Sequence, residues 1–335
     1  MYRKEQLLRT AIIVASVAAA LAAMVASIGS AAAQVYPSRP ITVILPFAAG
    51  GTVDAIPRIM AEHLRASLRQ PIIVENVSGA GGTIGTGRVA RAAPNGYTLG
   101  IGTFQTHVLI GAVYPLQYDL LKDFEPVALL GSSPNLIVAR SAVPAKDLKE
   151  LMAWLRVNND KVSQGHIGVG GGQHLCGIAM ENSIGAHWQF VPYRSAALAM
   201  QDLVGGQIDL MCTSLGTSPA MVRSGQVKTY AVTARTRLAS APEIPTVDEA
   251  GLPGLYISAW YGLYAPKGTS KDIIDKLNAA VASALADPAV RQRFADLGLE
   301  IPPHEQQTPE ALGAFQKNEI EKWWPIIKAA GIKAE

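Results

Sequence analysis

The sequence predicts an α/β protein of about two domains with mostly parallel sheets. Short β-branched runs alternate with segments whose apolar residues recur at helical spacing, as in chains that join parallel strands by crossover helices. A length of 335 residues corresponds to about two domains of roughly 150 residues. Because 49% of the residues are hydrophobic and 16% are charged, the chain can bury sizeable cores, which excludes disorder as its main state.

The first 33 residues predict an export signal. A basic start is followed by the apolar run Ala11–Ile28 and by Ala31-Ala32-Ala33, which has the small-x-small pattern of a signal peptidase site. We therefore expect cleavage after Ala33, a mature chain that begins at Gln34, and a periplasmic location. The alternative is a permanent membrane anchor, because an apolar run of 18 residues nearly spans a bilayer.

The elements of the first part of the mature chain follow from apolar runs and their breakers. Pro57 is tolerated only in a first helical turn, so we expect Asp54 to be the N-cap of the first helix. The expected elements are the strand Ile41–Leu45, a helix from Asp54 to Leu68, the strand Ile72–Val74, a glycine-dense loop at Ser78–Gly87, a helix at Arg88–Ala93 and the strand Tyr97–Ile101.

The second part continues the alternation. We expect strands at Leu136–Ala139, His166–Val169, Phe190–Pro192, Ile208–Cys212, Val227–Thr233 and Tyr256–Tyr264. Helices are expected at Leu148–Leu155, 173–183 and Ala196–Val204. Three further helices begin at the caps Thr269 or Ser270, Asp287-Pro288 and Thr308-Pro309, and the last ends near Trp323-Trp324-Pro325. Because no Ser/Gly-rich linker is present, the chain is expected to cross between its domains on strands.

Charge and motifs exclude several function classes. Three of the 29 basic and one of the 26 acidic residues fall in the signal, so the mature chain is nearly neutral and no nucleic-acid partner is expected. Walker A, GxSxG and HExxH motifs are absent from the sequence. The loops Gly79–Ile84 and Gly168–Gln173 lack the last glycine of the dinucleotide fingerprint, which argues against a Rossmann dehydrogenase. We expect no cofactor.

Cys176 and Cys212 leave two interpretations open. They can pair in an oxidising compartment, but their spacing does not determine the separation of their Cα atoms. The general burial of cysteine favours two free thiols. Neither the cysteines nor the six histidines have zinc-type spacing, so we expect no metal site.

Two strand–glycine–helix junctions carry the functional signal. They are Pro46–Asp54 and Gly168–His174. Glycines let a backbone approach a ligand closely, and free N–H groups at a helix start favour an anion. The alternative for each loop is a simple turn from strand to helix. Two such loops, each following a strand of a different sheet, favour a ligand cleft, because ligands bind outside the carboxyl ends of strands.

At these loops the chain resembles the Bug-type extracytoplasmic solute receptors of tripartite tricarboxylate transport systems. The resemblance covers the whole mature chain. Its motifs are Tyr36–Pro40, Pro46–Asp54, Val74–Asn76, Gly79–Gly85, Ala92–Leu99, Asp123–Val127, Val191–Arg194, Gln201–Met211, Pro245–Gly251 and Trp260–Leu263.

The resemblance implies a two-domain, type II-like periplasmic-binding-protein fold with a ligand cleft between the domains. Domain 1 would comprise 34–135 and 262–335, and domain 2 would comprise 136–261. The two glycine loops would grip a ligand carboxylate through backbone N–H groups and bridging waters, and Thr103–His107 would face the same cleft. The ligand-binding residues expected on this basis are Phe47, Ala48, Gly50, Gly51, Thr52, Asp54, Thr103, Thr106, His107, Gly168, Gly170, Gly171, Gly172, Gln173, His174, Tyr193 and Thr213.

Several of these residues have structural alternatives. Helix capping competes with ligand contact for Asp54, and an ion pair competes with a carboxylate clamp for Arg194. A structural role is favoured for His174, and Tyr193 can equally belong to the core. Trp260 and Tyr261 are expected to pack at the domain crossover.

Departures from the family pattern bear on which ligand is selected. They are Gln105 in the segment Thr103–His107, Ser195 and Leu198 after Tyr193-Arg194, Cys212-Thr213-Ser214, and three glycines before Gln173. The resemblance implies a monomer that binds a small organic carboxylate, meets membrane transporter subunits and catalyses no reaction. An exported enzyme that uses the same cleft and a sensor partner of a membrane kinase are the alternatives.

Overall fold

The structure is a computed structural model that describes residues 36–332, apart from 50–51, 194 and 218. The predicted signal peptide and its cleavage site lie outside the described residues. Arg39–Glu335 form one compact unit, separate from Met1–Ser38, and all elements below belong to that larger unit. No helix in the described part of the chain has both the length and the apolar character needed to cross a membrane.

The described residues form a mixed sheet in the order β2-β1-β3-β9-β4-β7-β5-β6, with β8 beside β4. Its strands are β1 (Ile41–Leu45), β2 (Ile72–Asn76), β3 (Thr98–Thr103), β4 (Phe124–Arg140), β5 (Ser163–His166), β6 (Gln189–Pro192), β7 (Leu210–Ser214), β8 (Val227–Val232) and β9 (Ser258–Pro266). The outer pairs β1–β2, β1–β3, β5–β6 and β5–β7 are parallel. The expectation of mostly parallel sheets is wrong, because each observed pairing of β4 and β9 is antiparallel.

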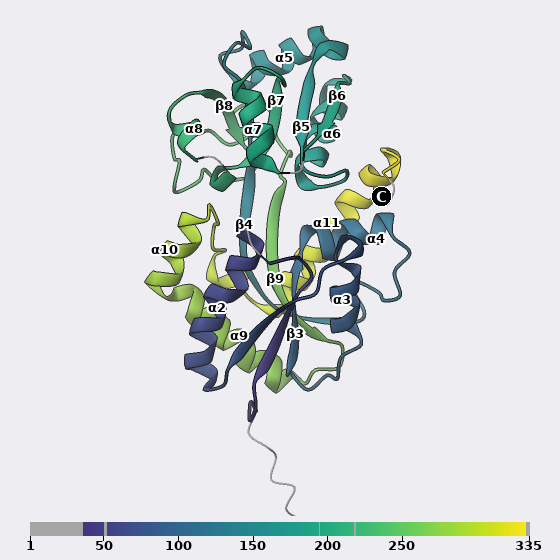
Figure 1. The fold of residues 1–335 in the computed structure, drawn as a ribbon, viewed down its shortest axis with the longest axis vertical. Helices are drawn as coiled ribbons and strands as arrows, with labels where there is room; N and C mark the ends of the chain where they lie inside the picture. The colour runs from purple at the N-terminus through teal and green to yellow at the C-terminus, as the bar shows by residue number, and fades with distance from the viewer. Residues whose placement is uncertain (1–35, 50–51, 194, 218, 333–335) are drawn as a thin grey trace, which may run out of the picture. The chain divides into compact units, whose positions relative to one another are not determined.

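Strand β4 is far longer than predicted, since only Leu136–Ala139 was expected. It pairs with β9 from Phe124 to Pro134 and with β7 and β8 from Asn135 onward. Figure 1 shows β4 and β9 running from the group around β1 and β3 to the group around β5–β8. Two register shifts against β9 accommodate the irregular sequence in the first part of the strand.

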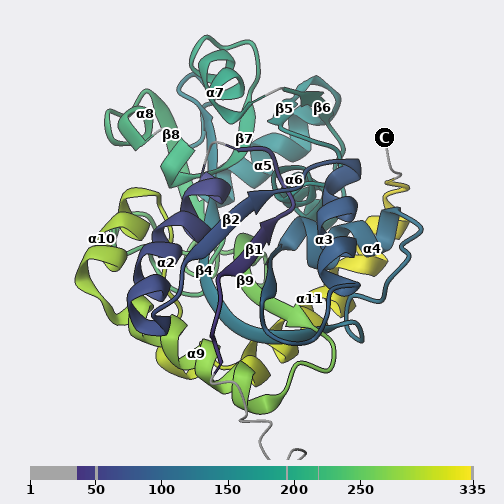
Figure 2. The ribbon, with the colours of Figure 1, turned by 60° about the horizontal axis from the view of Figure 1, so that its bottom comes forward.

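The helices are α2 (Thr52–Leu68), α3 (Thr83–Ala90), α4 (Ile110–Val113), α5 (Leu148–Asn158), α6 (Gly172–Ile184), α7 (Ala196–Val204), α8 (Pro219–Arg223), α9 (Lys271–Ala286), α10 (Pro288–Asp296) and α11 (Pro309–Ala329). In Figure 2, β1 and β2 run between α2 on one side and α3 on the other. The predicted caps Asp287 and Thr308 accept hydrogen bonds from the first-turn N–H groups of α10 and α11.

Three predicted boundaries are wrong. The helix expected at Arg88–Ala93 already begins at Thr83, so the glycine-dense segment is partly helical. The strand expected at His166–Val169 is Ser163–His166, because the chain turns immediately afterwards into the glycine loop. Helix α11 continues through Pro325 to Ala329, because the buried side chains Trp323 and Ile327 hold its apolar face against the core.

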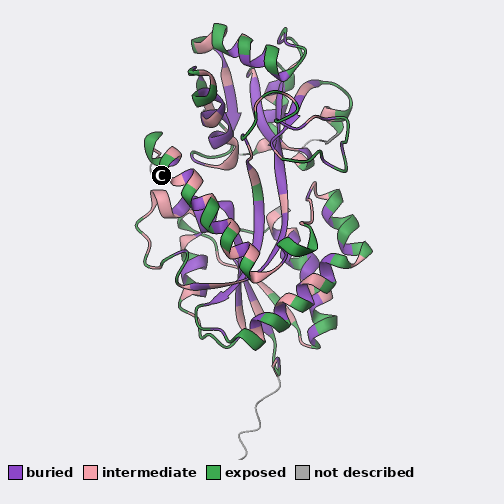
Figure 3. Cartoon of the chain, turned by 180° about the vertical axis from the view of Figure 1, so that it is seen from behind, coloured by how far each residue is buried: buried purple, intermediate pink, exposed green. Residues whose placement is uncertain are grey.

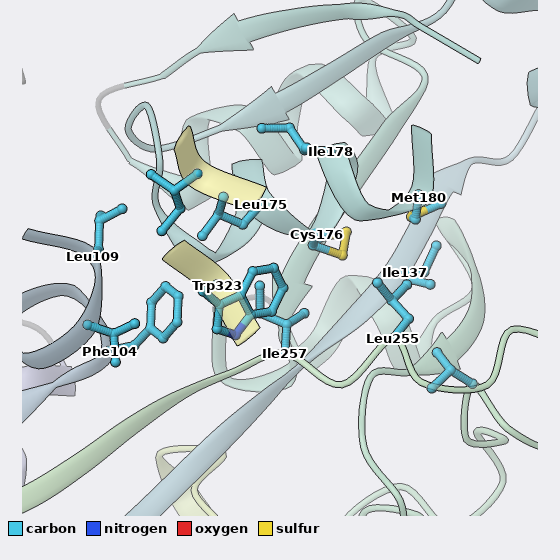
Figure 4. Packing of buried hydrophobic residues seen from close by; sticks show 14 of the residues in the cluster. Phe104, Leu109, Ile137, Leu175, Cys176, Ile178, Met180, Leu255, Ile257 and Trp323 are labelled. Carbon is cyan, nitrogen blue, oxygen red and sulfur yellow. A yellow bond between two sulfur atoms is a disulfide. The ribbon is translucent and has the colours of Figure 1, made fainter. Parts of the chain in front are cut away.

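The main core joins both ends of the sheet to α11. Figure 3 shows buried central strands and exposed outer faces of the surrounding helices. In Figure 4, Trp323 lies beside Phe104 and Ile257, and its ring meets that of Phe104 edge to face with a centroid separation of 5.9 Å. The expected packing role of Trp260 is confirmed, because its fully buried ring meets Phe315 of α11.

Candidate functional site

The first loop leads from β1 into α2. Gly50 and Gly51 lie outside the described residues; Phe47 is half-buried, Ala48 is exposed, and Thr52 is the first residue of α2. Asn76 at the end of β2 donates from Nδ2 to the Phe47 carbonyl oxygen over 3.1 Å. This bond ties the loop to the neighbouring strand.

Asp54 lies inside α2, so the expectation that it is the N-cap is wrong. Its carboxylate accepts two hydrogen bonds from Arg58, at 3.0 and 2.9 Å, and one from Asn76 at 3.0 Å. The pairing raises the pKa of Arg58, chiefly through the hydrogen bond to Asp54. The Asp54 carboxylate therefore has structural partners that join α2 to β2.

The glycines between β2 and α3 permit close packing. A Cβ atom on Gly82 would lie 2.6 Å from Cγ2 of Thr106, and one on Gly85 would lie 2.5 Å from the Val77 carbonyl oxygen. Side chains at these positions would collide with the segments beside them. The packing of α3 therefore accounts for these two glycines.

The segment Thr103–His107 is a buried polar turn. The Thr103 N–H donates to Oγ1 of Thr106 over 3.0 Å, and the two hydroxyls lie 3.2 Å apart. Oγ1 of Thr106 also lies 3.1 Å from Nδ1 of His107. Thr103 is 6% exposed and Thr106 is completely buried, so their hydroxyls stabilise the turn from within.

His107 is enclosed in the core. Its ring stacks on Tyr264 at a centroid separation of 4.2 Å and is 2% exposed. Burial lowers the pKa of His107 to about 3, so the ring is neutral at physiological pH. Its contribution to a cleft is therefore to hold the turn that carries Thr103 and Thr106.

In the second loop, Gly168–His174, several N–H groups donate hydrogen bonds within the loop or to the ring of the preceding His166. The N–H of Gly168 donates to Nδ1 of His166 over 3.2 Å, and that of Gly170 donates to Nδ1 of His174 over 2.9 Å. The N–H of Gly171 donates to the Gly168 carbonyl oxygen. These three donors, all on residues predicted to bind the ligand, therefore have partners within the loop or on His166.

Free donors lie at the start of α6 instead. Helix α6 begins at Gly172 and has no side-chain cap. Among the described residues, no hydrogen bond engages the N–H groups of Gly172, Gln173 and His174. A helix start with unpaired N–H groups carries about half a positive charge, which suits an anion.

Two histidines hold the loop in this shape. The rings of His166 and His174 stack at 4.7 Å, and Phe190 meets His174 edge to face at 4.4 Å. Burial, followed by the neighbouring His166, lowers the pKa of His174 to about 4. Since each Nδ1 atom accepts a loop N–H, the unprotonated Nδ1 of each ring is part of the loop's architecture.

The cysteines form a disulfide, so the preference for free thiols is wrong. Cys176 on α6 and Cys212 on β7 are bonded, with their Cα atoms 6.3 Å apart. Helix α6 packs against β7, which brings together two cysteines that are 36 residues apart in sequence. The bond fastens the helix that carries the free donors to the sheet.

The remaining predicted residues are dispersed. Tyr193 donates its hydroxyl to Asp202 over 2.7 Å, and burial, followed by this bond, raises the pKa of Tyr193 to about 12. Thr213 is completely buried and pairs with Leu136, whose side chain packs toward α7. Ser195 caps α7 by accepting the N–H of Leu198, and Arg194 lies outside the described residues.

The second loop lies close to the segment that follows Thr103–His107. A Cβ atom on Gly170 would lie 3.0 Å from Leu109, two residues after His107. Sequence reasoning missed Asn135, the residue nearest to a Cβ atom on Gly172. Its signal was a single amide directly before the apolar run Leu136–Ala139.

Comparison with known proteins gives one family. A model of the tripartite tricarboxylate transporter family receptor matches residues 56–332. The solved structure of the periplasmic binding protein BugD is 39% identical, with a TM-score of 0.72, and the match covers 90% of this chain and 100% of that one.

Two further relatives were solved with ligands. MatC from Rhodopseudomonas palustris, with bound malate, is 40% identical with a TM-score of 0.72, over 87% of this chain and 100% of that one. An R. palustris protein with adipate is 30% identical with a TM-score of 0.74, over 89% and 99% of the two chains.

Proposed function

Because the chain belongs to the tripartite tricarboxylate transporter receptor family and has the periplasmic-binding-protein fold of its Bug relatives, we propose that it captures a small carboxylate and delivers it to a membrane transporter. The relatives solved with malate and adipate support a carboxylate ligand. The observation that carries the proposal in this chain is the uncapped start of α6 beside the glycine loop.

The anion is held mainly by backbone donors. The N–H groups of Gly172, Gln173 and His174 point from the first turn of α6, and the start of α2 at Thr52 supplies a second helix N-terminus. The nearby cation Arg58 is already paired with Asp54. Neutral amides that converge on one carboxylate can replace a charged clamp.

The strand crossing supports a division into two domains. We place domain 1 at 34–135 and 262–335, and domain 2 at 136–261. In support, β4 changes partner between Pro134 and Asn135, and β9 begins at Ser258. A carboxylate shared by α2 and α6 would then favour closure, because only the closed state offers both sets of donors.

Export and partners belong to the same proposal. Cleavage after Ala33 would release a mature, monomeric receptor into the periplasm, where it would meet the membrane subunits of its transporter. Mass spectrometry of protein from the native compartment should find Gln34 at the N-terminus. An intact segment 1–33 would refute the cleavage.

A ligand screen tests the proposed function. The mature protein is heated with succinate, malate, adipate, aromatic acids and amino acids, and binding is confirmed by calorimetry. A ligand at 100 times its Kd should add about 2.7 kcal/mol to the free energy of unfolding. We expect at least one carboxylate to bind and to be recovered unchanged. Turnover would support the enzyme alternative, and the absence of any carboxylate ligand would refute the receptor.

A further inference from the structure

Asn135 stands at the point where the sheet changes partner. It is the first residue of β4 to pair with β7, opposite Ser214. Its N–H lies 3.0 Å from Oγ1 of Thr233, and its carbonyl oxygen accepts the N–H of Thr233 over 2.8 Å. A further hydrogen bond joins its N–H to the Ile257 carbonyl oxygen. The backbone of Asn135 is therefore held by three segments, and its side chain starts from a rigid base.

Asn135 is largely buried, and its side-chain amide has no hydrogen-bond partner among the described residues. The residue is 6% exposed, and no hydrogen bond among the described residues engages its side chain. Two polar neighbours differ in this respect: Ser133 donates to the Gly298 carbonyl oxygen, and the Ser214 hydroxyl lies 3.0 Å from Oγ1 of Thr217. Most largely buried amides in proteins have a hydrogen-bond partner, so an amide without one calls for an explanation such as an ordered water or a bound ion.

The amide faces the free start of α6. A Cβ atom on Gly172 would meet one described neighbour within 4 Å, namely Nδ2 of Asn135 at 3.9 Å. Apart from the chain neighbours of Gly172 and the first turn of α6, no other described atom lies within 4 Å of that Cβ position. Two kinds of unpaired donor, the side-chain amide and the backbone N–H groups of α6, therefore border the same space.

We propose that Asn135 is a ligand-binding residue that donates its amide N–H to the carboxylate held at the start of α6. This inference rests on the proposed function, since it assumes that a carboxylate is the ligand. One carboxylate oxygen accepts from the first-turn N–H groups of α6, and the other accepts from Nδ2 of Asn135. Because both kinds of donor are neutral and fixed in direction, the site selects a planar anion with two oxygens.

Two substitutions separate the hydrogen bond from the charge. Asn135→Ala removes the donor, which should weaken the binding of malate and adipate about tenfold to a hundredfold, as for a hydrogen bond to a charged group. Asn135→Asp places a carboxylate at the same position, where it repels the ligand and occupies the N–H groups of α6. We expect binding to fall more than about a hundredfold, with a Tm at least as high as that of the wild type, because the new carboxylate stabilises the helix start.

The affinity of the mature protein and its variants for malate and adipate is measured by calorimetry, with Asn182→Asp as the matched control. Asn182 is exposed on the same helix, so the same change of charge there should leave binding within about twofold. If Asn135→Asp binds malate and adipate within about threefold of the wild type, this inference is overturned and the proposed function still stands. A loss confined to malate would also overturn it, because the contact would then be to the hydroxyl. A wild type that binds no carboxylate would overturn the proposed function and this inference with it.

Discussion

Replacing both cysteines by alanine should lower the free energy of unfolding by about 4 kcal/mol. The bond between Cys176 and Cys212 closes a segment of 36 residues. Loop closure of that length removes about 13 cal/mol/K of entropy from the unfolded chain, which is about 4 kcal/mol at 25 °C. For a mature chain of about 300 residues, the corresponding fall in Tm is about 6 °C.

Urea unfolding followed by tryptophan fluorescence measures this effect. The oxidised wild type is compared with the wild type under reductant, with Cys176→Ala and with the double variant, and the last three should lose similar stability. Intact mass should show that the wild type lacks the two thiol hydrogens. If reduction leaves the unfolding midpoint unchanged, the disulfide does not constrain the chain and the argument from loop entropy is wrong.

Three further changes test the packing around the site. Because the pKa of His174 is lowered from 6.5 to about 4, the unfolded chain binds its proton first, so His174 alone should reduce stability by up to about 3 kcal/mol as the pH drops from 6.5 to 4. His107, whose pKa is also lowered, acts in the same direction, so His174→Gln should reduce the slope without abolishing it in urea titrations at several pH values. Asp54→Ala leaves Arg58 without its buried partner and should cost about 1–2 kcal/mol in chemical denaturation, whereas Asp275→Ala, in an exposed pair, should cost less than about 0.5 kcal/mol; equal losses would contradict the structural role of Asp54. Gly85→Ala should cost about 2 kcal/mol or more, because its Cβ atom would lie 2.5 Å from a backbone oxygen, and an unchanged Tm would refute that packing.

Local signals predicted the elements that end at strong breakers or caps. Strand β1 stops at Pro46, and both β1 and α7 were predicted at their observed bounds; the structure shows that Ser195 caps α7. The first part of β4 escaped prediction because Gly131–Pro134 does not resemble a strand. This segment forms a strand because it pairs with β9, which lies more than a hundred residues later in the chain.

The candidate site was predicted in outline and missed in detail. The sequence indicates a glycine loop that leads into a helix, but it does not show that His166 and His174 accept two of the loop's N–H groups. That outcome depends on how the rings fold back over the loop. The disulfide was not predicted for a similar reason, because the distance between Cys176 and Cys212 is set by the packing of α6 on β7.

A crystal structure of the mature protein with a bound dicarboxylate would show which groups hold the anion. The carboxylate oxygens should lie about 2.9 Å from the backbone nitrogens at the start of α6, among Gly172, Gln173 and His174. A carboxylate held by an arginine or lysine side chain, with these three N–H groups turned to water, would contradict it.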